Sequence, residues 1–179
     1  MKPIISGNCR IRHPEYFSVG EHSIVDDYSY FSTKVRIGRC SHIAACCTVA
    51  GGKKMSFTLG NYCSVSSGVR IWCASDDFVN DIVTIVPEGS GGIKDHLITG
   101  DVSIADMCAV GSNAVIMPGN SIPEGTVIGA LSFVPPGFKF KSWSVYAGIP
   151  VKRIGSRNRK NVLRQAALLE RRMRERKLK

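Results

Sequence analysis

The sequence lacks the hydrophobic patterns that direct a chain into or across a membrane. Its 179 residues contain no uninterrupted run of about eighteen apolar residues, the length of a transmembrane helix. The N-terminal stretch has no charged segment followed by an apolar one, so it does not resemble a secretory signal. We therefore expect a cytoplasmic protein without a membrane span, built as one domain with a short appendix.

Paired cysteines and closely spaced histidines are also missing. The seven cysteines are odd in number and show no C-x-x-C pair, the spacing of a zinc site. We interpret them as small apolar side chains in a reducing compartment. A metal-dependent hydrase would need three histidines around one ion, and no two of the four histidines have ligand-like spacing. We expect no metal site.

Acidic residues are scarce. The 14 Asp and Glu stand against 24 Lys and Arg, which gives a formal net charge of +10. Clustered positive charge is typical of proteins that bind nucleic acid or another polyanion. Here the excess is concentrated from Lys152 onward, whereas the repeats described next are nearly balanced. A solvated polar face on a terminal helix accounts for this distribution, and we expect no nucleic-acid partner.

The sequence does contain an apolar residue at every sixth position. Three blocks show this spacing, residues 19–49, 59–71 and 104–134. A period of six fits neither the roughly 3.6 residues of a helical turn nor the two of a half-buried strand. The residue after the apolar one is small in most repeats, as in Val110-Gly111. The pattern predicts a chain that turns a corner every six residues and stacks on itself as a parallel β-helix.

Interruptions of the period indicate how the chain is organised. Residues 1–18 keep the spacing in a shifted phase and predict an additional first coil. Residues 51–54, Gly-Gly-Lys-Lys, interrupt the repeats, and residues 74–101 cannot follow them, so we expect a loop projecting from the stack. The repeats end at Pro135-Pro136-Gly137. We therefore expect a β-helix domain over residues 1–155.

A basic helix is predicted for residues 156–179. Ser156 or Asn158 is a suitable N-cap for it. Apolar residues at helical spacing form a stripe that would pack on the parent fold or on another subunit: Val162, Ala166, Leu169 and Met173.

Three segments resemble the hexapeptide-repeat acyltransferases. Residues 42–52 begin with His42 and end with Gly51-Gly52, residues 66–78 contain Ser75-Asp76-Asp77, and residues 110–152 contain Ala147-Gly148-Ile149-Pro150. The resemblance covers roughly residues 19–155 and is strongest to the branch that modifies sugars in surface-polysaccharide and O-antigen (lipopolysaccharide) synthesis. It implies an all-β, left-handed parallel β-helix with an extruded loop and a C-terminal α-helix, and a homotrimer with an active site in each cleft between neighbours.

The resemblance also implies acetyl-CoA as the acyl donor. Its pantetheine arm would lie along the outer wall of the later repeats, where backbone groups of small residues would offer hydrogen bonds. Positive side chains after the last repeats would meet the phosphates of the cofactor. The cofactor-binding residues expected on these grounds are Gly111, Ser112, Gly129, Ala130, Gly148, Lys139, Lys141, Lys152 and Arg153.

Acetyl transfer needs a nucleophile held against the thioester, a proton acceptor and donors for the oxyanion. The apolar residues at every sixth position are called anchors below. His42 directly precedes the anchor Ile43, so its side chain should lie on the outer wall, where a neutral imidazole can accept a proton. Asp76 and Asp77 would orient that ring or bind the sugar, or else cap a turn at the loop entrance. Many relatives carry a histidine in this loop, and this chain has Ser75-Asp76-Asp77 instead. A backbone amide near Gly68 or Gly111 could stabilise the oxyanion.

These observations predict an acetyl-CoA-dependent acetyltransferase acting on an amino or hydroxyl group of a sugar or nucleotide-linked sugar. O-transfer and N-transfer both stay open. The aromatic rings of Trp72 and Phe78 would contact a sugar or the cofactor, or be buried under the loop. An alternative function is a noncatalytic trimeric scaffold that binds anionic partners through its basic tail.

Overall fold

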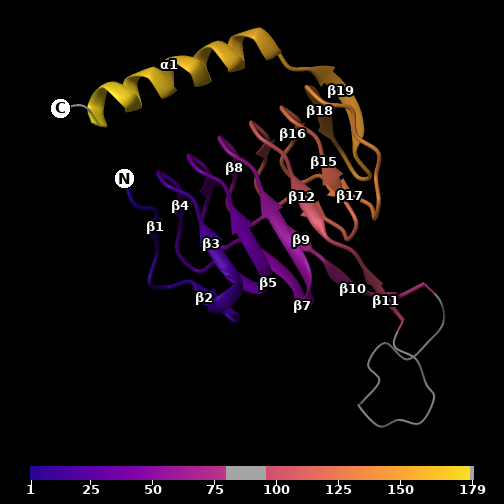
Figure 1. Cartoon of the computed structure of the whole chain (residues 1–179). Coiled ribbons are helices and arrows are strands. Elements are labelled where there is room, and N and C mark those ends of the chain that lie inside the picture. Colours follow the sequence, from indigo (N-terminus) through magenta and orange to yellow (C-terminus); the bar gives the residue numbers. More distant parts are fainter. Residues whose placement is uncertain (80–95, 178–179) are drawn as a thin grey trace.

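The computed structural model describes residues 1–79 and 96–177. Within them the chain forms a parallel β-helix followed by one α-helix (Figure 1), as the six-residue period predicts. Val25 pairs in parallel register with Ile43, eighteen residues further along the chain. Three repeats of six therefore make one coil, and each repeat contributes a strand to one of three faces.

Face 1 is a stack of short parallel strands. Its strands are β1 (Ile4–Ile5), β4 (Ile24–Val25), β6 (His42–Ile43), β8 (Ser64–Val65), β13 (Ala109–Val110), β16 (Val127–Ile128) and β18 (Ser144–Ala147). The antiparallel strand β19 (Lys152–Ser156) pairs with β18 and closes this sheet. The second residue of each two-residue strand is the apolar anchor of the sequence period.

Faces 2 and 3 share two long strands that continue around a corner, β5 (Tyr30–Ile37) and β7 (Thr48–Leu59). Face 2 contains their first halves with β2 (Arg10–Ile11), β9 (Arg70–Trp72), β14 (Val115–Ile116) and β17 (Phe133–Val134). Face 3 contains their second halves with β3 (Phe17–Val19), β12 (Val102–Ile104) and β15 (Ser121–Ile122).

The core is the column of anchors inside these faces. From Val25 to Val134 every anchor of the three blocks is at most 2% exposed. Each stacks on the corresponding anchor of the next coil; Phe31, for example, pairs with Val49, and Val49 with Ile71. The apolar period thus produces the fold directly, because one side chain in every six turns inward and successive ones enter the core from successive faces of the prism.

The first coil predicted for residues 1–18 is confirmed. Ile5 pairs with Val25, Ile11 with Phe31 and Val19 with Ile37, all in parallel. A short 3₁₀ helix, η1 (Pro14–Tyr16), connects the last two strands of this coil.

The predicted interruption at residues 51–54 is confirmed as a shift of register, and the predicted end of the repeats needs correction. Residues 51–54 do not leave the stack, because β7 runs unbroken through them and absorbs the extra residues as a shift of register against β5 around Thr33. The stack also does not end at Pro135-Pro136-Gly137. Tyr146 pairs with Ile128 and is 4% exposed, so an aromatic ring fills the next core position.

The loop predicted for residues 74–101 begins and ends as an antiparallel hairpin. Its strands are β10 (Ala74–Asp76) and β11 (Leu97–Thr99), and Asp76 pairs with Leu97. The hairpin projects from the stack after β9, at the corner between faces 2 and 3 (Figure 1). Residues 80–95, the middle of the predicted loop, lie outside the described residues.

The C-terminal helix α1 (Arg159–Lys177) runs along the corner between faces 3 and 1. It begins after Asn158, whose side-chain oxygen accepts a hydrogen bond from the Asn161 amide at 3.1 Å, as expected of an N-cap. Three residues of the predicted stripe, Val162, Ala166 and Met173, are half-buried, whereas Leu169 is exposed.

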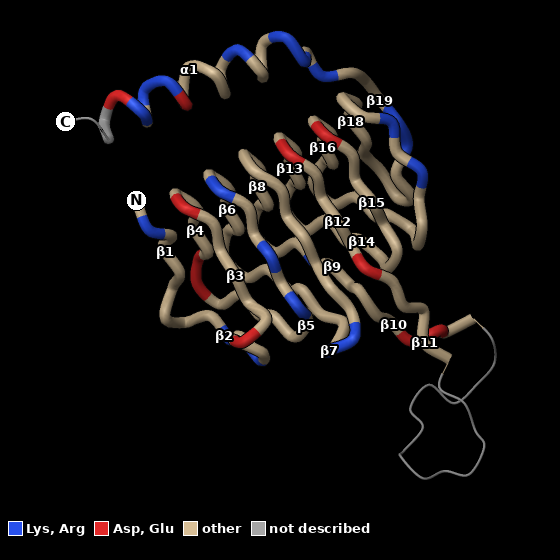
Figure 2. Tube along the Cα trace, in the orientation of Figure 1, with Lys and Arg blue, Asp and Glu red and all other residues tan. Residues whose placement is uncertain are grey.

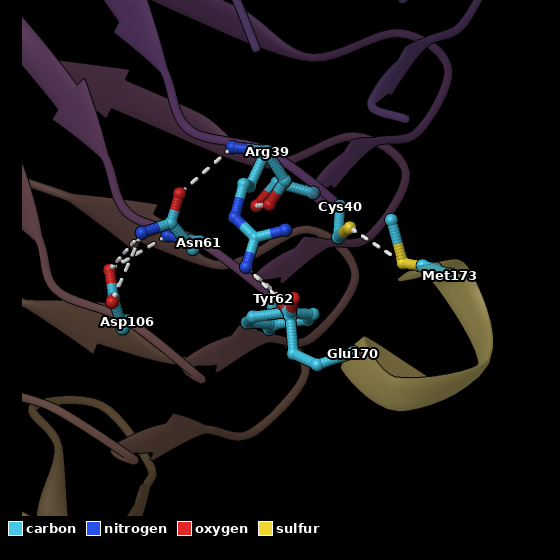
Figure 3. A network of polar contacts seen from close by, with 8 residues as sticks. Arg39, Cys40, Asn61, Tyr62, Asp106, Glu170 and Met173 are labelled. Carbon is cyan, nitrogen blue, oxygen red and sulfur yellow. Dashed lines mark hydrogen bonds and ion pairs between the residues drawn. The ribbon is translucent and has the colours of Figure 1, made fainter. Parts of the chain in front are cut away.

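Residues of successive turns fasten α1 to this corner (Figure 3). Glu170 of α1 forms an ion pair with Arg39, and Met173 Sδ lies 4.0 Å from Cys40 Sγ. The Arg39 guanidinium also lies 5.3 Å from the ring centre of Tyr62 in the next coil. The helix therefore braces several coils at once.

Candidate active site

Backbone amides at the corner between faces 1 and 2 divide into two groups. The Gly111 amide donates to the Ile128 carbonyl at 2.8 Å, and the Gly129 amide donates to the Tyr146 carbonyl at 2.8 Å. These bonds belong to the ladder between coils. Among the described residues, the amides of Ser112 and Ala130 have no hydrogen bond within the chain. The glycine amides predicted to bind the cofactor are thus already used, and the next residue in each repeat supplies the available donor.

The small side chains at this corner have a structural cause. A Cβ atom on Gly111 would lie 2.4 Å from the Ala130 backbone nitrogen, which no real contact allows. Glycine is therefore required for the coils to approach one another. The same close approach leaves Ser112 half-buried and Ala130 exposed on the outer wall, where a thin chain could lie along them.

The oxyanion donor was predicted to be a backbone amide near Gly68 or Gly111, and the amides of these two glycines are themselves engaged. The Gly68 amide donates to the Ala45 carbonyl at 3.0 Å, and the Gly111 amide is used as described above. Both bonds join neighbouring coils, so an amide beside these glycines, such as that of Ser112, remains the candidate donor.

The basic residues expected near the cofactor phosphates lie after the last coils. Lys139, Lys141, Lys152 and Arg153 are all exposed. Arg153 is held in place, because its guanidinium donates to Ser144 Oγ at 2.9 Å and to Ser156 Oγ at 2.6 Å.

Gly148 belongs to the same end of the molecule. Its amide donates to Ser132 Oγ at 3.2 Å, and its carbonyl accepts from the Phe133 amide at 3.0 Å. Like Gly111 and Gly129, it has its amide engaged within the chain.

His42 lies on the outer wall of face 1, as predicted. Its Nε2 is 2.8 Å from Asp26 Oδ2, and both side chains are 42% exposed. Asp26 follows β4 in the neighbouring coil. Asp76 and Asp77 were predicted to orient this ring or to bind the sugar; within this chain the carboxylate beside the ring comes from Asp26.

The two aspartates of the hairpin differ in their surroundings. Asp77 Oδ1 accepts a hydrogen bond from the Val79 amide at 3.0 Å, a turn of the kind that aspartate favours. The Asp77 amide bonds to the His96 carbonyl across the hairpin at 3.0 Å. Asp76 is half-buried in β10, and its carboxylate has no hydrogen bond to another described residue. Of the pair, Asp76 has the carboxylate available for chemistry.

The aromatic side chains near the hairpin also differ. Trp72 is half-buried at the end of β9, whereas Phe78 is 75% exposed. Burial of Phe78 under the loop is therefore not observed.

The cysteines behave mainly as packing residues. All seven are free thiols; Cys47, Cys63, Cys73 and Cys108 are buried, and Cys46 is exposed. Burial raises the pKa of Cys47 and raises that of Cys73 to about 12, which keeps both as neutral thiols.

Among the described residues no three His, Cys, Asp or Glu side chains gather into a possible metal site. Within the same residues, no helix has both the length and the apolar character of a membrane span.

Comparison with solved structures identifies the family. The chain is 30% identical to AntD, an N-acyltransferase from Bacillus cereus in complex with dTDP and 3-hydroxybutyryl-CoA. The match covers 94% of this chain and 87% of that one, with a TM-score of 0.82. The chain belongs to the hexapeptide-repeat acyltransferases. The fold is therefore the left-handed parallel β-helix that the resemblance implied, and the protein is an acyltransferase.

Other relatives agree with this assignment. A dTDP-4-amino-4,6-dideoxy-D-glucose acyltransferase from Escherichia coli is 28% identical over 148 residues, 80% of this chain and 73% of the relative. A hexapeptide-repeat acetyltransferase from Vibrio cholerae shares the fold at 20% identity, over 82% of this chain and 77% of that one, with a TM-score of 0.60. The chain matches no protein-family model. Further structures of AntD contain dTDP-4-amino-4,6-dideoxyglucose and coenzyme A, and several carry a replaced serine or aspartate.

Proposed function

We propose that the protein transfers an acetyl group from acetyl-CoA to the amino group of a nucleotide-linked amino sugar. The observation that carries this proposal is the likeness to AntD, which extends over 94% of the chain and so includes coils at both ends of the stack. Structures of AntD contain both a dTDP-linked amino sugar and coenzyme A. Of the two acceptors left open by the sequence, the amine is therefore favoured over the hydroxyl.

Acyl transfer to an amine forms one bond and breaks one bond at the thioester carbon. The neutral amine attacks the thioester carbonyl, a carbon–nitrogen bond forms, and the oxygen takes up negative charge. The carbon–sulfur bond then breaks, the thiolate of coenzyme A leaves, and the nitrogen gives up one proton. An amine is a better nucleophile than a hydroxyl, so the protein mainly has to hold the reactants together and accept that proton.

Asp76 is the proton acceptor that the structure supports best. Its carboxylate is free of other described partners, half-buried and carried on a hairpin that projects from the stack. The replaced serine and aspartate of AntD are ten residues apart, and Ser66 with Asp76, or Ser67 with Asp77, has the same spacing here. Since Asp77 caps a turn, we assign the role to Asp76 and keep His42, paired with Asp26, as the alternative base.

The donor would lie along the corner between faces 1 and 2 at the late coils. The free amides of Ser112 and Ala130 point to this path, and the exposed basic residues after the last coil would meet the cofactor phosphates. AntD was crystallised with 3-hydroxybutyryl-CoA, so a larger acyl group than acetyl is the competing donor.

Assembly as a homotrimer is part of the proposal. The outer wall of the late coils is apolar: Ala109, Val127 and Val145 face outward on face 1, and Leu131 at the adjoining corner is 66% exposed. Apolar outer walls of this kind favour contact with another copy of the chain. Light scattering of the purified protein would give three times the mass of the monomer.

We also propose where the reaction takes place and which synthesis it serves. Seven unpaired thiols suit the reducing cytoplasm. The resemblance of the Ser75-Asp76-Asp77 and Ala147-Gly148-Ile149-Pro150 segments supports a place in surface-polysaccharide synthesis.

The proposal is tested by comparing two acceptors that differ in one group. Release of the coenzyme A thiol is followed with acetyl-CoA and either dTDP-4-amino-4,6-dideoxyglucose or dTDP-6-deoxyglucose, which carries a hydroxyl in place of the amine. We expect turnover above the hydrolysis background with the amine only. Turnover with the hydroxyl sugar alone would indicate O-transfer. No turnover with either, together with salt-sensitive retention on heparin, would favour the noncatalytic scaffold.

A further inference from the structure

We propose that the outer wall of β3, β5 and β7 binds the diphosphate and base of the nucleotide-linked acceptor. This inference rests on the proposed function and adds to it the place and the residues of the nucleotide subsite. The wall belongs to face 3 at the early coils, whereas the free amides assigned to the donor lie at the corner between faces 1 and 2 of the late coils. Within one chain these surfaces lie on opposite sides of the prism, so the acceptor bound to one copy would react with the donor bound to a neighbouring copy of the proposed homotrimer.

A cavity of about 270 Å³ lies on this wall. Side chains that line it include Tyr16, Ser18, Lys34, Arg36, Ser56 and Thr58. Strand alternation explains their direction: Val35 and Phe57 are buried in the core, so the residues on either side of them point outward. The register places Lys34 beside Ser56 and Arg36 beside Thr58. Two cations and two hydroxyl groups thus form a compact polar patch.

This patch has the chemistry that a diphosphate requires. Lys34 and Arg36 are both exposed, and β5 carries them two residues apart on the same side of the strand. Figure 2 shows the basic positions along β5 within this wall. A guanidinium and an ammonium at that spacing can contact neighbouring phosphate groups, and serine and threonine hydroxyls can donate to the same oxygens.

Tyr16 supplies an aromatic surface at the edge of the cavity. It ends η1, is 47% exposed, and has its ring centre 5.6 Å from Lys34 Nζ. A flat base can stack on such a ring while its phosphates reach Lys34 and Arg36. Glu15, which also lines the cavity, would repel phosphate and can instead accept hydrogen bonds from the base or the ribose. The cavity therefore has a base end at η1 and a phosphate end at β5.

The phosphate end is connected to the hairpin that carries Asp76. The Ser56 amide donates to Asp101 Oδ1 at 2.7 Å, and the Cys73 thiol donates to the Ser56 carbonyl at 3.4 Å. Cys73 and Asp101 flank the hairpin on its two sides in the sequence, so Ser56 joins the cavity wall to the base of the hairpin. A sugar attached to the second phosphate would extend from the cavity toward that hairpin.

The test is to measure dTDP and coenzyme A binding separately by calorimetry. The double variant Lys34→Gln/Arg36→Gln removes both cations from exposed positions, and Arg164→Gln/Arg172→Gln, at exposed positions of α1, is the control that removes the same net charge. We expect the double variant to raise the Kd for dTDP at least about tenfold and to leave the Kd for coenzyme A within about twofold. The control should change neither.

Two results would overturn the inference. An unchanged Kd for dTDP in the double variant would remove the subsite, while continued acylation of the amino sugar would keep the proposed function. A selective loss of coenzyme A binding would assign the wall to the phosphates of the donor instead. If the wild-type protein neither binds dTDP nor acylates a dTDP-linked amine, the proposed function fails and the subsite with it.

Discussion

His42 Nε2 lies 2.8 Å from Asp26 Oδ2 on the outer wall of face 1. The two residues are sixteen positions apart in the chain, nearly one coil, so the β-helix itself brings them together. The free carboxylate of Asp76, by contrast, sits on a hairpin at the corner between the other two faces. Within one chain the structure therefore contains two separate candidate proton acceptors.

Single replacements distinguish these two acceptors. With an amine acceptor we expect Asp76→Asn to lower kcat by at least about 10²-fold, because the reaction loses its base. His42→Ala should lower it less than about tenfold. Asp77→Asn serves as the matched control on the same hairpin and should chiefly affect the turn. A loss of 10² or more in His42→Ala, with Asp76→Asn active, would transfer the role to the His42–Asp26 pair.

The corner between faces 1 and 2 offers a test of the donor path. Ala130→Phe places a bulky ring beside the free amide of Ala130, and we expect the KM for acetyl-CoA to rise about tenfold while the KM for the sugar stays unchanged. Ala45→Phe makes the same change at the equivalent position of an earlier coil and should leave both values unaltered. If the two variants behave alike, the donor does not lie along the late coils.

The six-residue period was sufficient to predict the fold because it reports burial directly. Positions such as Ile43 and Ile116 are inside the prism, and no other common architecture buries every sixth residue. The end of the stack was misplaced because Pro135-Pro136-Gly137 resembles a terminator, although Phe140 and Tyr146 follow Val134 at the same spacing of six. The interruption of the period at residues 51–54 is real, but the strand stays in its sheet because it absorbs the additional residues as a shift of register.

The site residues were harder to predict from the sequence than the fold, because the hydrogen bonds of the folded chain determine which amides and carboxylates are available. The sequence indicated small residues at Gly111 and Gly129, but only the structure shows that their amides are used between the coils. The pairing of His42 with Asp26 could have been anticipated from the eighteen-residue coil, which pairs His42 with Ile24 and so places Asp26, just after β4, diagonal to His42. Nothing in the sequence distinguishes Asp76 from Asp77.

Core packing gives a prediction of stability. Ile116 is fully buried, and Ile116→Ala should lower the free energy of unfolding by about 2–5 kcal/mol, since it leaves a cavity among stacked anchors. Ile24 faces outward and is 37% exposed, so Ile24→Ala should cost less than about 1 kcal/mol. Urea unfolding of both variants measures the difference. Equal losses would show that the anchor column is not the main source of stability.

The buried thiol of Cys73 predicts a dependence of stability on pH. Its pKa is raised by burial from an ordinary value of 9.0 to about 12, so the folded state favours the protonated thiol. The resulting contribution is complete below about pH 9 and is lost as pH rises toward 12. Urea unfolding at about pH 8 and pH 10.5 should therefore show a smaller loss of stability in Cys73→Ala than in the wild type. Equal losses in the two proteins would contradict the pKa shift.

N-acylation of the amino sugar is tested by identifying the bond that forms. The amino sugar of a dTDP-linked acceptor is labelled with nitrogen-15 and incubated with the protein and acetyl-CoA, and the product is followed by proton–nitrogen NMR. We expect a new amide resonance that grows in step with the release of coenzyme A thiol. Thiol release with the label remaining a free amine would contradict N-acylation of the nucleotide-linked sugar.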